Sequence, residues 1–375
     1  MSVTTAADHH TDELPHPETS GAIDSDIHFY VKDGIDSVLP YMPKQWQRTF
    51  EMRGTRLGGD TPVPQRFDFP TGSRLRLDAF TPDGGAPGTD AAFASVDLMD
   101  RFHMSAGVMS SLEAGQQAQG FAGTEASAIM CSAFNDYALE QWYGVDSRFR
   151  LAMCVPSVFP EAAAKEVTRL AHHPGVAAVY VPLINVPLGN RHFDPIYAAA
   201  QDAGLPVFLH ITAAEYTYQG TPTFPGGWLE NFGERRVAYT LLGPAALSSL
   251  IFNGTLARFP RLNFVFAEFG FGWALPLMWR MDSTWRYSRA GTPWLREPPS
   301  HYVRDRIKFG TQPVDDPENP AHLDMLVEML GVETLMFSTD YPHWDGDTPE
   351  RVFQTQSADD KKLIFHASAE KIFRL

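Results

Sequence analysis

Four apolar runs of this chain each end on ionisable side chains of types that bind metal ions. The first run ends at Asp26 and His28, and the others end at His210, Glu268 and Asp340. Because an unpaired charge inside a buried strand is costly, such residues are expected where strands emerge from a core. In a parallel α/β barrel the carboxyl ends of all strands open on one face, which holds the active site. Carboxylates and imidazoles that converge there are the ligand types of a divalent metal ion.

The spacing of the first pair supports one shared ion. Asp26 and His28 are two residues apart, so on a strand their side chains face the same side. With His210 and Asp340 placed alike at their own strand ends, metal binding is favoured over a loop histidine beside a solvated aspartate. A core histidine bonded to a carbonyl remains the alternative for His210. An N-cap of the following segment remains the alternative for Asp340.

The elements that must position these residues alternate regularly. Short, mostly apolar runs typical of parallel strands buried on both faces occur at 21–28, 104–110, 149–155, 176–181, 205–210, 263–268, 306–311 and 334–340. Helical patterns fill gaps between them, at 124–143, from Pro160 onward, and at 196–203, 244–259, 273–287 and 321–330. The alternation predicts a (β/α)8 TIM barrel that forms a single domain over residues 21–375.

Two segments stand apart from the barrel pattern. Residues 1–20 have no basic n-region and no apolar h-region, so they are predicted to be a disordered arm and not a secretory signal. Residues 51–90 are rich in Gly, Pro, Arg and Asp and are predicted to be a loop or small subdomain inserted after the first strand and its helix. In this fold such an insertion lies on the catalytic face and can cover it. A tolerated surface insertion is the alternative.

Composition narrows the class of protein. The formal net charge of -15 disfavours nucleic acid and anionic membrane surfaces as partners. No apolar run is long enough to span a bilayer. The two cysteines, Cys131 and Cys154, imply no disulfide framework and suit a reducing compartment. A cytoplasmic protein is therefore expected.

The motifs resemble those of the amidohydrolase superfamily, in particular the branch similar to aminocarboxymuconate-semialdehyde decarboxylase. The matching stretches are Asp26-x-His28, 207–210 (VFLH), 259–262 (FPRL), 266–273 (FAEFGFGW) and 338–343 (STDYPH). Proteins of this branch are mononuclear metalloenzymes that cleave C–C or C–N bonds of small carboxylated substrates. Each motif is weak alone, but their order, each at a strand end, is specific.

The resemblance implies a ligand set and a mechanism. Asp26, His28, His210 and Asp340 would bind one divalent ion, Zn or alternatively Mn. The fourth strand offers no lysine to be carbamylated, which disfavours a two-metal site. The ion would act as a Lewis acid and lower the pKa of a bound water, with Asp340 as general base or proton carrier.

The chain departs from the family pattern at two positions. Its first ligand pair is Asp-x-His, where many relatives have His-x-His or Glu-x-His. Its sixth strand ends in Glu268, where decarboxylases of this branch usually carry a histidine. Glu268 would be a base, an orienting group, a further metal ligand or a structural partner of Arg235 or Arg280. Nonoxidative decarboxylation and hydrolysis therefore both stay open.

The expected substrate is a small aromatic or ring-fission carboxylate. His343 is predicted to bind this substrate or to orient Asp340, an exposed loop histidine being the alternative. The predicted substrate contacts are the aromatic walls and one insertion arginine: Trp273, Phe271, Tyr341 and Arg76. Barrel packing is the alternative for the aromatics, and an ordinary surface role is the alternative for the arginine.

The aromatic and Met-rich segment 271–280 has a helical spacing typical of a core or dimer face, and a homodimer is expected. The rival function is a metal-free, non-catalytic barrel that only binds a ligand. A flavin or Schiff-base barrel is disfavoured, because no glycine-rich dinucleotide motif is present and Lys308 lies inside a predicted strand.

Overall fold

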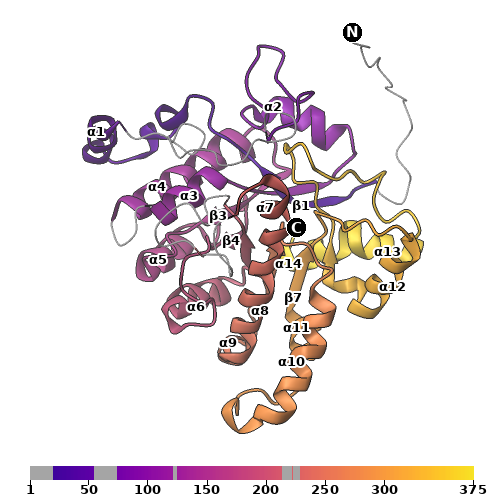
Figure 1. Cartoon of the computed structure of the whole chain (residues 1–375). Coiled ribbons are helices and arrows are strands. Elements are labelled where there is room, and N and C mark those ends of the chain that lie inside the picture. Colours follow the sequence, from indigo (N-terminus) through magenta and orange to yellow (C-terminus); the bar gives the residue numbers. More distant parts are fainter. Residues whose placement is uncertain (1–19, 55–73, 121–124, 213–221, 223–228) are drawn as a thin grey trace.

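The computed structural model describes residues 20–54, 74–120, 125–212, 222 and 229–375 (Figure 1). Its strands form one eight-stranded sheet in chain order, each parallel to the next. The strands are β1 (Ile23–His28), β2 (Ala106–Ser110), β3 (Phe149–Cys154), β4 (Val176–Tyr180), β5 (Val207–His210), β6 (Phe264–Ala267), β7 (Ile307–Gly310) and β8 (Leu335–Met336). All eight of the predicted strands are therefore confirmed.

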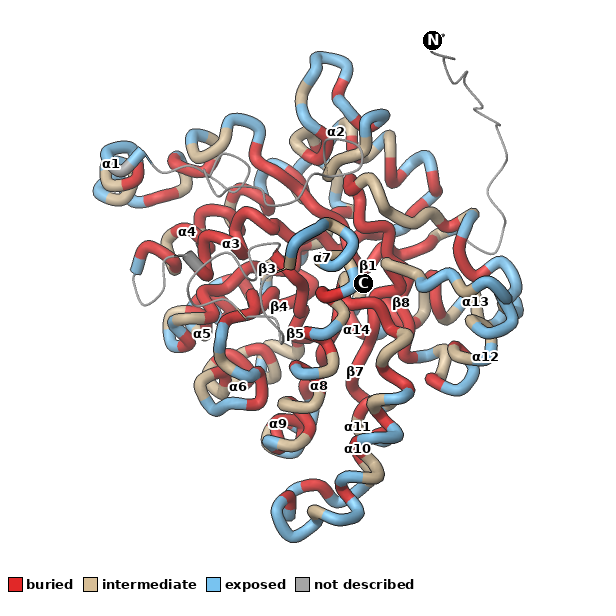
Figure 2. The backbone as a smooth tube through the Cα atoms, in the orientation of Figure 1, coloured by how far each residue is buried: buried red, intermediate tan, exposed pale blue. Residues whose placement is uncertain are grey.

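Helices connect the strands and surround the sheet (Figure 1). They are α1 (Lys44–Arg53), α2 (Ala91–Ala94), α3 (Leu112–Gly120), α4 (Glu125–Ala138), α5 (Pro160–Leu170), α6 (Asp194–Ala203), α7 (Phe232–Ala238), α8 (Leu242–Phe252), α9 (Thr255–Arg258), α10 (Ala274–Ser288), α11 (Pro299–Arg306), α12 (Pro320–Leu330), α13 (Ala358–Lys362) and α14 (Ser368–Phe373). Burial follows this layering, since the strands are buried and the outer helices carry the exposed residues (Figure 2).

The sheet is drawn into a barrel by contacts between its first and last strands. Ser25 N donates to Phe337 O over 2.8 Å, and His28 N donates to Tyr341 O over 2.7 Å. Asp340 N donates to the carbonyl of Asp26 over 3.1 Å. These bonds join the segment after β8 to β1, which confirms the predicted (β/α)8 TIM barrel. They also bring two predicted ligand positions, 26 and 340, side by side.

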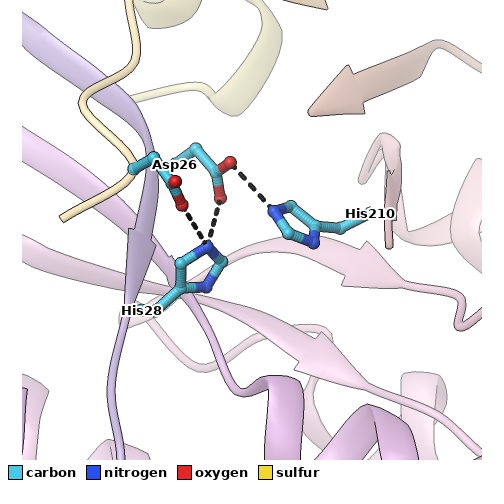
Figure 3. A group of neighbouring side chains, drawn as sticks. Asp26, His28 and His210 are labelled. Atoms are coloured by element: carbon cyan, nitrogen blue, oxygen red, sulfur yellow. Dashed lines mark hydrogen bonds and ion pairs between the residues drawn. The ribbon is translucent and has the colours of Figure 1, made fainter. Parts of the chain in front are cut away.

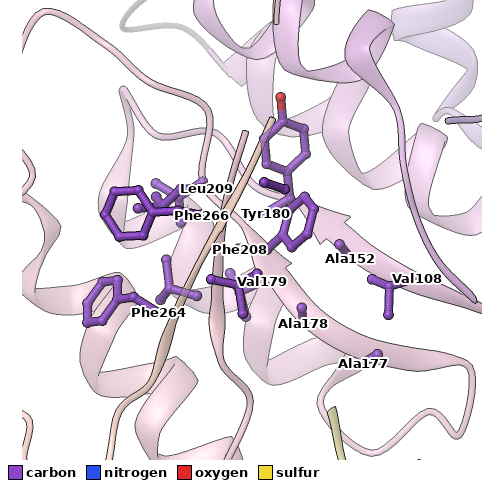
Figure 4. Close-up of a cluster of buried hydrophobic side chains, with 14 of the residues drawn as sticks. Val108, Ala152, Ala177, Ala178, Val179, Tyr180, Phe208, Leu209, Phe264 and Phe266 are labelled. Carbon is purple, nitrogen blue, oxygen red and sulfur yellow. The ribbon is translucent and has the colours of Figure 1, made fainter. Parts of the chain in front are cut away.

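Large apolar side chains pack the strands. Val179, Phe208 and Phe264, from three successive strands, are fully buried and lie together (Figure 4). Parallel pairing keeps neighbours in register, with Val179 opposite Val207 and Phe208 opposite Val265. Burying each phenylalanine stabilises the fold by roughly 1.5–3 kcal/mol. This packing fixes the strand ends from which the site residues project.

Two element boundaries differ from the sequence predictions. The helix expected over 244–259 is two helices, α8 and α9, because Gly254 adopts a left-handed backbone (φ 74°) between them. The last strand is shorter than the predicted 334–340, since only Leu335–Met336 belongs to the ladder. Helices α2, α3, α7, α11, α13 and α14 were not predicted; α3 and α7, for example, carry little apolar periodicity in their sequences.

The described part of the insertion lies against the loop after β8. Arg76 N donates to Pro342 O over 2.9 Å, and Trp344 N donates to Arg74 O over 3.0 Å. The remainder of the insertion, 55–73, and the arm, 1–19, lie outside the described residues, so the domain limits stay predictions. None of the described helices is long and apolar enough to cross a membrane.

Candidate metal centre

The four predicted ligands meet at the carboxyl ends of the barrel strands. Asp26, His28, His210 and Asp340 are fully buried and offer one ligand atom each, all within 4.8 Å of one another. The carboxylate of Asp26 lies between the two imidazoles (Figure 3). It accepts a hydrogen bond from His210 Nε2 over 3.0 Å, and His28 Nε2 lies 3.7 Å away. Two strands and one strand-end loop thus build the cluster.

Each imidazole is oriented by a bond at its other nitrogen. Nδ1 of His210 donates to the carbonyl of Ile211, and Nδ1 of His28 lies 3.2 Å from Ser110 Oγ. Both rings therefore present Nε2 to the carboxylates. Outer partners of this kind fix the ring and its tautomer in metal sites.

Several atoms of the cluster lack hydrogen-bond partners among the described residues. They are Asp26 Oδ1, His28 Nε2 and Asp340 Oδ2, all buried. Asp340 Oδ1 is 2.9 Å from His28 Nε2, but this contact lacks hydrogen-bond geometry. A buried polar atom without a partner is costly, and a bound cation would satisfy all three. The residues present therefore fit one divalent ion held by two carboxylates and two imidazoles.

Two of the strand-end acids sit on unusual backbone. Glu268 has φ 59° and Asp340 has φ 60°, both in the left-handed region that side-chain-bearing residues rarely occupy. Such conformations cost on the order of 1–3 kcal/mol and cluster at functional sites. Glu268 directly follows the last residue of β6, whereas Asp340 lies in the loop that follows β8.

The members of the cluster have pKa values that are shifted in different directions. Burial lowers the pKa of His28. Burial has the same tendency at His210, but the carboxylate of Asp26, together with Glu268 and Asp340, outweighs it and raises the pKa to about 10. Burial would raise the pKa of Asp340, yet His343 and His28 outweigh it and hold that pKa low. Without an ion, His210 is therefore a cation between carboxylates.

A short relay of hydrogen bonds leads away from Asp340. Its Oδ1 accepts a hydrogen bond from His343 Nδ1 over 2.6 Å, and His343 Nε2 lies 2.8 Å from the hydroxyl of Tyr30. Burial raises the pKa of Tyr30, so the hydroxyl keeps its proton beside that nitrogen. The guanidinium of Arg74 lies 5.0 Å from the centre of the Tyr30 ring. His343 is thus buried, not exposed, and it is bonded to Asp340.

Glu268 lies at the edge of the cluster, 10% exposed. Its Oε2 is 3.4 Å from His210 Nε2, and its Oε1 is 3.6 Å from Nη1 of Arg236. The partner arginine is therefore Arg236, and the sequence-based alternatives Arg235 and Arg280 were wrong. Burial raises the pKa of Glu268, as does Asp340, while His210 and Arg236 oppose the shift.

A buried acid beneath the ligands was missed from the sequence. Asp24 Oδ1 accepts from the backbone N–H of Asp26 and from that of Thr339, each over 3.0 Å. Its Oδ2 accepts from the Thr339 hydroxyl. Burial raises the pKa of Asp24 to about 7 against these bonds. The signal was available, since Asp24 precedes Asp26 and His28 in the same two-residue alternation.

The predicted substrate contacts fall into two groups. Tyr341 follows Asp340 and is buried, with the guanidinium of Arg76 5.8 Å from its ring centre. That guanidinium also donates two bonds to Asp78, over 3.0 and 2.8 Å. Trp273 packs against barrel aromatics and donates to Phe269 O, and Phe271 is fully buried. The structure does not bring Trp273 or Phe271 into contact with the ligand cluster, and their substrate role stays a prediction.

The amidohydrolase family model matches residues 23–375. The chain therefore belongs to the amidohydrolase family. Together, the barrel, the buried ligand cluster and the family define a metal-dependent hydrolase or carboxy-lyase.

Solved structures share the fold. An amidohydrolase from Mycobacterium avium subsp. paratuberculosis is 22% identical with a TM-score of 0.68, and the match covers 94% of this chain and 99% of that one. The 5-carboxyvanillate decarboxylase from Sphingomonas paucimobilis is 20% identical with a TM-score of 0.65, and the match covers 94% of this chain and 98% of that one. The 5-carboxyvanillate decarboxylase from Novosphingobium aromaticivorans is 17% identical with a TM-score of 0.67, and the match covers 96% of this chain and 97% of that one. Its structure was solved in complex with manganese and 4-hydroxy-3-methoxy-5-nitrobenzoic acid. No curated protein matches the chain.

Proposed function

We propose that this protein cleaves a bond of a small aromatic carboxylate at one divalent ion, with Asp340 as the group that moves the proton. The observation that carries the proposal is the cluster itself. Four buried ligand-type residues leave several atoms without hydrogen-bond partners among the described residues, and Asp340 is linked outward through His343. A metal-free barrel that only binds a ligand would gain nothing from unpaired buried charges.

The ion would be held by Asp26, His28, His210 and Asp340. When bound, it supplies Lewis acidity that polarises a substrate oxygen and makes a bound water acidic. Zn was the first expectation. Three of the solved decarboxylase complexes contain manganese, and a set of two carboxylates and two imidazoles suits Mn equally. Both ions therefore enter the tests.

The chain supplies two carboxyl groups with opposite tendencies. Asp340 is held ionised by His343 and His28, so it is ready to accept a proton. Burial and the charge of Asp340 favour the protonated form of Glu268, so Glu268 is the group ready to donate one. Environments that push the pKa values of two neighbouring groups apart assign the base and the acid. We assign the base to Asp340 and the acid or orienting role to Glu268.

These roles fit two reactions. In decarboxylation, Asp340 accepts a proton from water and then delivers it to the ring carbon from which carbon dioxide leaves. In hydrolysis, Asp340 accepts the proton of the attacking water and Glu268 protonates the leaving group. Similarity in fold to the solved decarboxylases of 5-carboxyvanillate and 2,6-dihydroxybenzoate supports decarboxylation. Glu268, where such decarboxylases usually carry histidine, supports the second.

Substrate contacts are proposed nearest to the cluster. Tyr341 directly follows Asp340 in the chain, and the guanidinium of Arg76 lies beside its ring, where a substrate carboxylate would compete with Asp78. Trp273 and Phe271 are the more distant of the aromatic positions in the proposal. A homodimer in the cytoplasm completes the hypothesis.

The test uses purified protein loaded with Mn²⁺ or Zn²⁺. We expect about one ion per chain by elemental analysis and metal-dependent turnover of a hydroxylated aromatic carboxylate, starting with 5-carboxyvanillate and 2,6-dihydroxybenzoate. Decarboxylation releases carbon dioxide and places deuterium from heavy water on carbon. Hydrolysis places heavy oxygen from labelled water in a new acid or alcohol. Two ions per chain would refute the mononuclear site, and turnover unaffected by removing the ion would refute the metal-dependent mechanism.

The role of Glu268 is tested by Glu268→Gln. This change keeps the shape of the side chain and removes its proton-transfer capacity. We expect turnover to fall on the order of a hundredfold while the ion stays bound. Loss of metal affinity would instead make Glu268 a ligand. Unchanged turnover would contradict any catalytic role at this position.

A further inference from the structure

An arginine that the sequence analysis passed over reaches the edge of the metal cluster. Arg236 lies on α7, in the connection between β5 and α8. Its Nη2 is 2.6 Å from Asp345 Oδ2, and its Nη1 is 3.6 Å from Glu268 Oε1. The side chain is 27% exposed, so the guanidinium lies largely inside the protein. One cation thus touches carboxylates from two different strand-end loops.

Asp345 is a fixed anchor for this arginine. The loop after β8 that carries it is tied down by the barrel, since Gln312 Nε2 donates to Asp345 O over 3.2 Å. Within the loop, Asp347 N donates to Thr339 O over 3.0 Å. The 2.6 Å contact is an ion pair between two opposite charges, and it ties the guanidinium to this loop by charge and not by a hydrogen bond. The position of the guanidinium is therefore set by the loop that follows Asp340.

The carboxyl group of Glu268 has a different neighbour on each side. It sits on left-handed backbone at the end of β6, with Oε2 toward His210 and Oε1 toward Arg236. Nη1 of Arg236 faces Oε1 on the side away from the cluster, so the carboxyl group lies between a guanidinium and an imidazole.

We propose that Arg236 is a positioning residue, which with Asp345 holds the carboxyl group of Glu268 against His210 at the mouth of the metal centre. The inference deepens the proposed function and rests on it for its catalytic consequence. Arg236 acts through Glu268 and does not itself touch the reacting atoms. Its sequence neighbour Arg235 lies 4.8 Å from the ring centre of Tyr239 and provides the matched control.

The first arm of the test is structural and independent of any reaction. Crystals of Arg236→Met loaded with Mn²⁺ alone should show the Glu268 carboxyl group displaced from His210 by 1 Å or more, while the four ligands keep their places. Arg235→Met should leave Glu268 where it is. If Arg236→Met does not fold, Asp345→Asn removes the anchor instead and should displace the same group. A Glu268 carboxyl group that stays in place when Arg236 or its anchor is removed overturns the proposal.

The second arm is a double-mutant cycle between Arg236 and Glu268. With 5-carboxyvanillate or 2,6-dihydroxybenzoate, whichever the wild type turns over, Arg236→Met should lower kcat about tenfold or more and change KM less than threefold. In the Glu268→Gln background the same change should cost less than threefold. Arg236→Lys, which keeps the charge, should recover part of kcat. Additive losses would overturn the proposal, as would a raised KM at unchanged kcat, which would mean that Arg236 binds substrate directly. A wild type without turnover refutes the proposed function, and the crystals then decide the role of Arg236.

Discussion

Metal binding at this site should require the departure of a proton from His210. In the metal-free protein His210 Nε2 donates to Asp26 Oδ2 over 3.0 Å, and the surrounding carboxylates raise the pKa of His210 to about 10. Its Nδ1 is already engaged by the carbonyl of Ile211, so Nε2 is the nitrogen that faces the ligand atoms. An ion and a proton therefore compete for the same nitrogen.

The competition between the ion and the proton determines how metal affinity depends on pH. Below a pKa of about 10, metal affinity should rise about tenfold per pH unit, hence roughly a hundredfold between pH 6 and pH 8. At pH 7 the affinity should be about a thousandfold below its limit at high pH. In the metal-free protein the raised pKa stabilises the fold. That contribution, on the order of 5 kcal/mol, is complete below about pH 6.5 and is lost as the pH rises through about 10.

Isothermal titration calorimetry with Mn²⁺ measures both quantities. Titrations at pH 6, 7 and 8, in buffers of different ionisation enthalpy, should show the hundredfold change and the release of about one proton per ion. Replacing the exposed His301, which is outside the cluster, by Gln should alter neither value. Affinity that is flat from pH 6 to pH 8, with no proton released, would refute the protonated state of His210.

Two substitutions test the ligand set and its support. His210→Ala should lower metal affinity on the order of a hundredfold or more while circular dichroism shows a retained fold, and full metal occupancy in this variant would make His210 only a core histidine. Asp24→Ala should lower the free energy of unfolding by about 3 kcal/mol or more, measured by chemical denaturation, because buried donors of Asp26 and Thr339 lose their acceptor. Unchanged stability would show that water replaces the carboxylate there.

The local pattern of the sequence determined the barrel and the candidate ligand set. Runs of apolar residues are long enough to define buried parallel strands. A charged residue at the end of such a run therefore lies at the mouth of the barrel. Asp26 and His28 could also be predicted to share one site, because residues two apart on a strand point to the same side. Asp24 obeys the same rule but was missed, since an acid one step deeper in a strand has no ligand motif to mark it.

Contacts between distant loops were decided only by the tertiary structure. The partner of Glu268 is Arg236 and not Arg235 or Arg280, because α7 places this one arginine beside the end of β6. Tyr30 reaches His343 only because the segment after β8 folds back onto β1. Strand-end chemistry follows from local periodicity, whereas the orientation of side chains across the barrel mouth depends on loop geometry that no short stretch of sequence encodes.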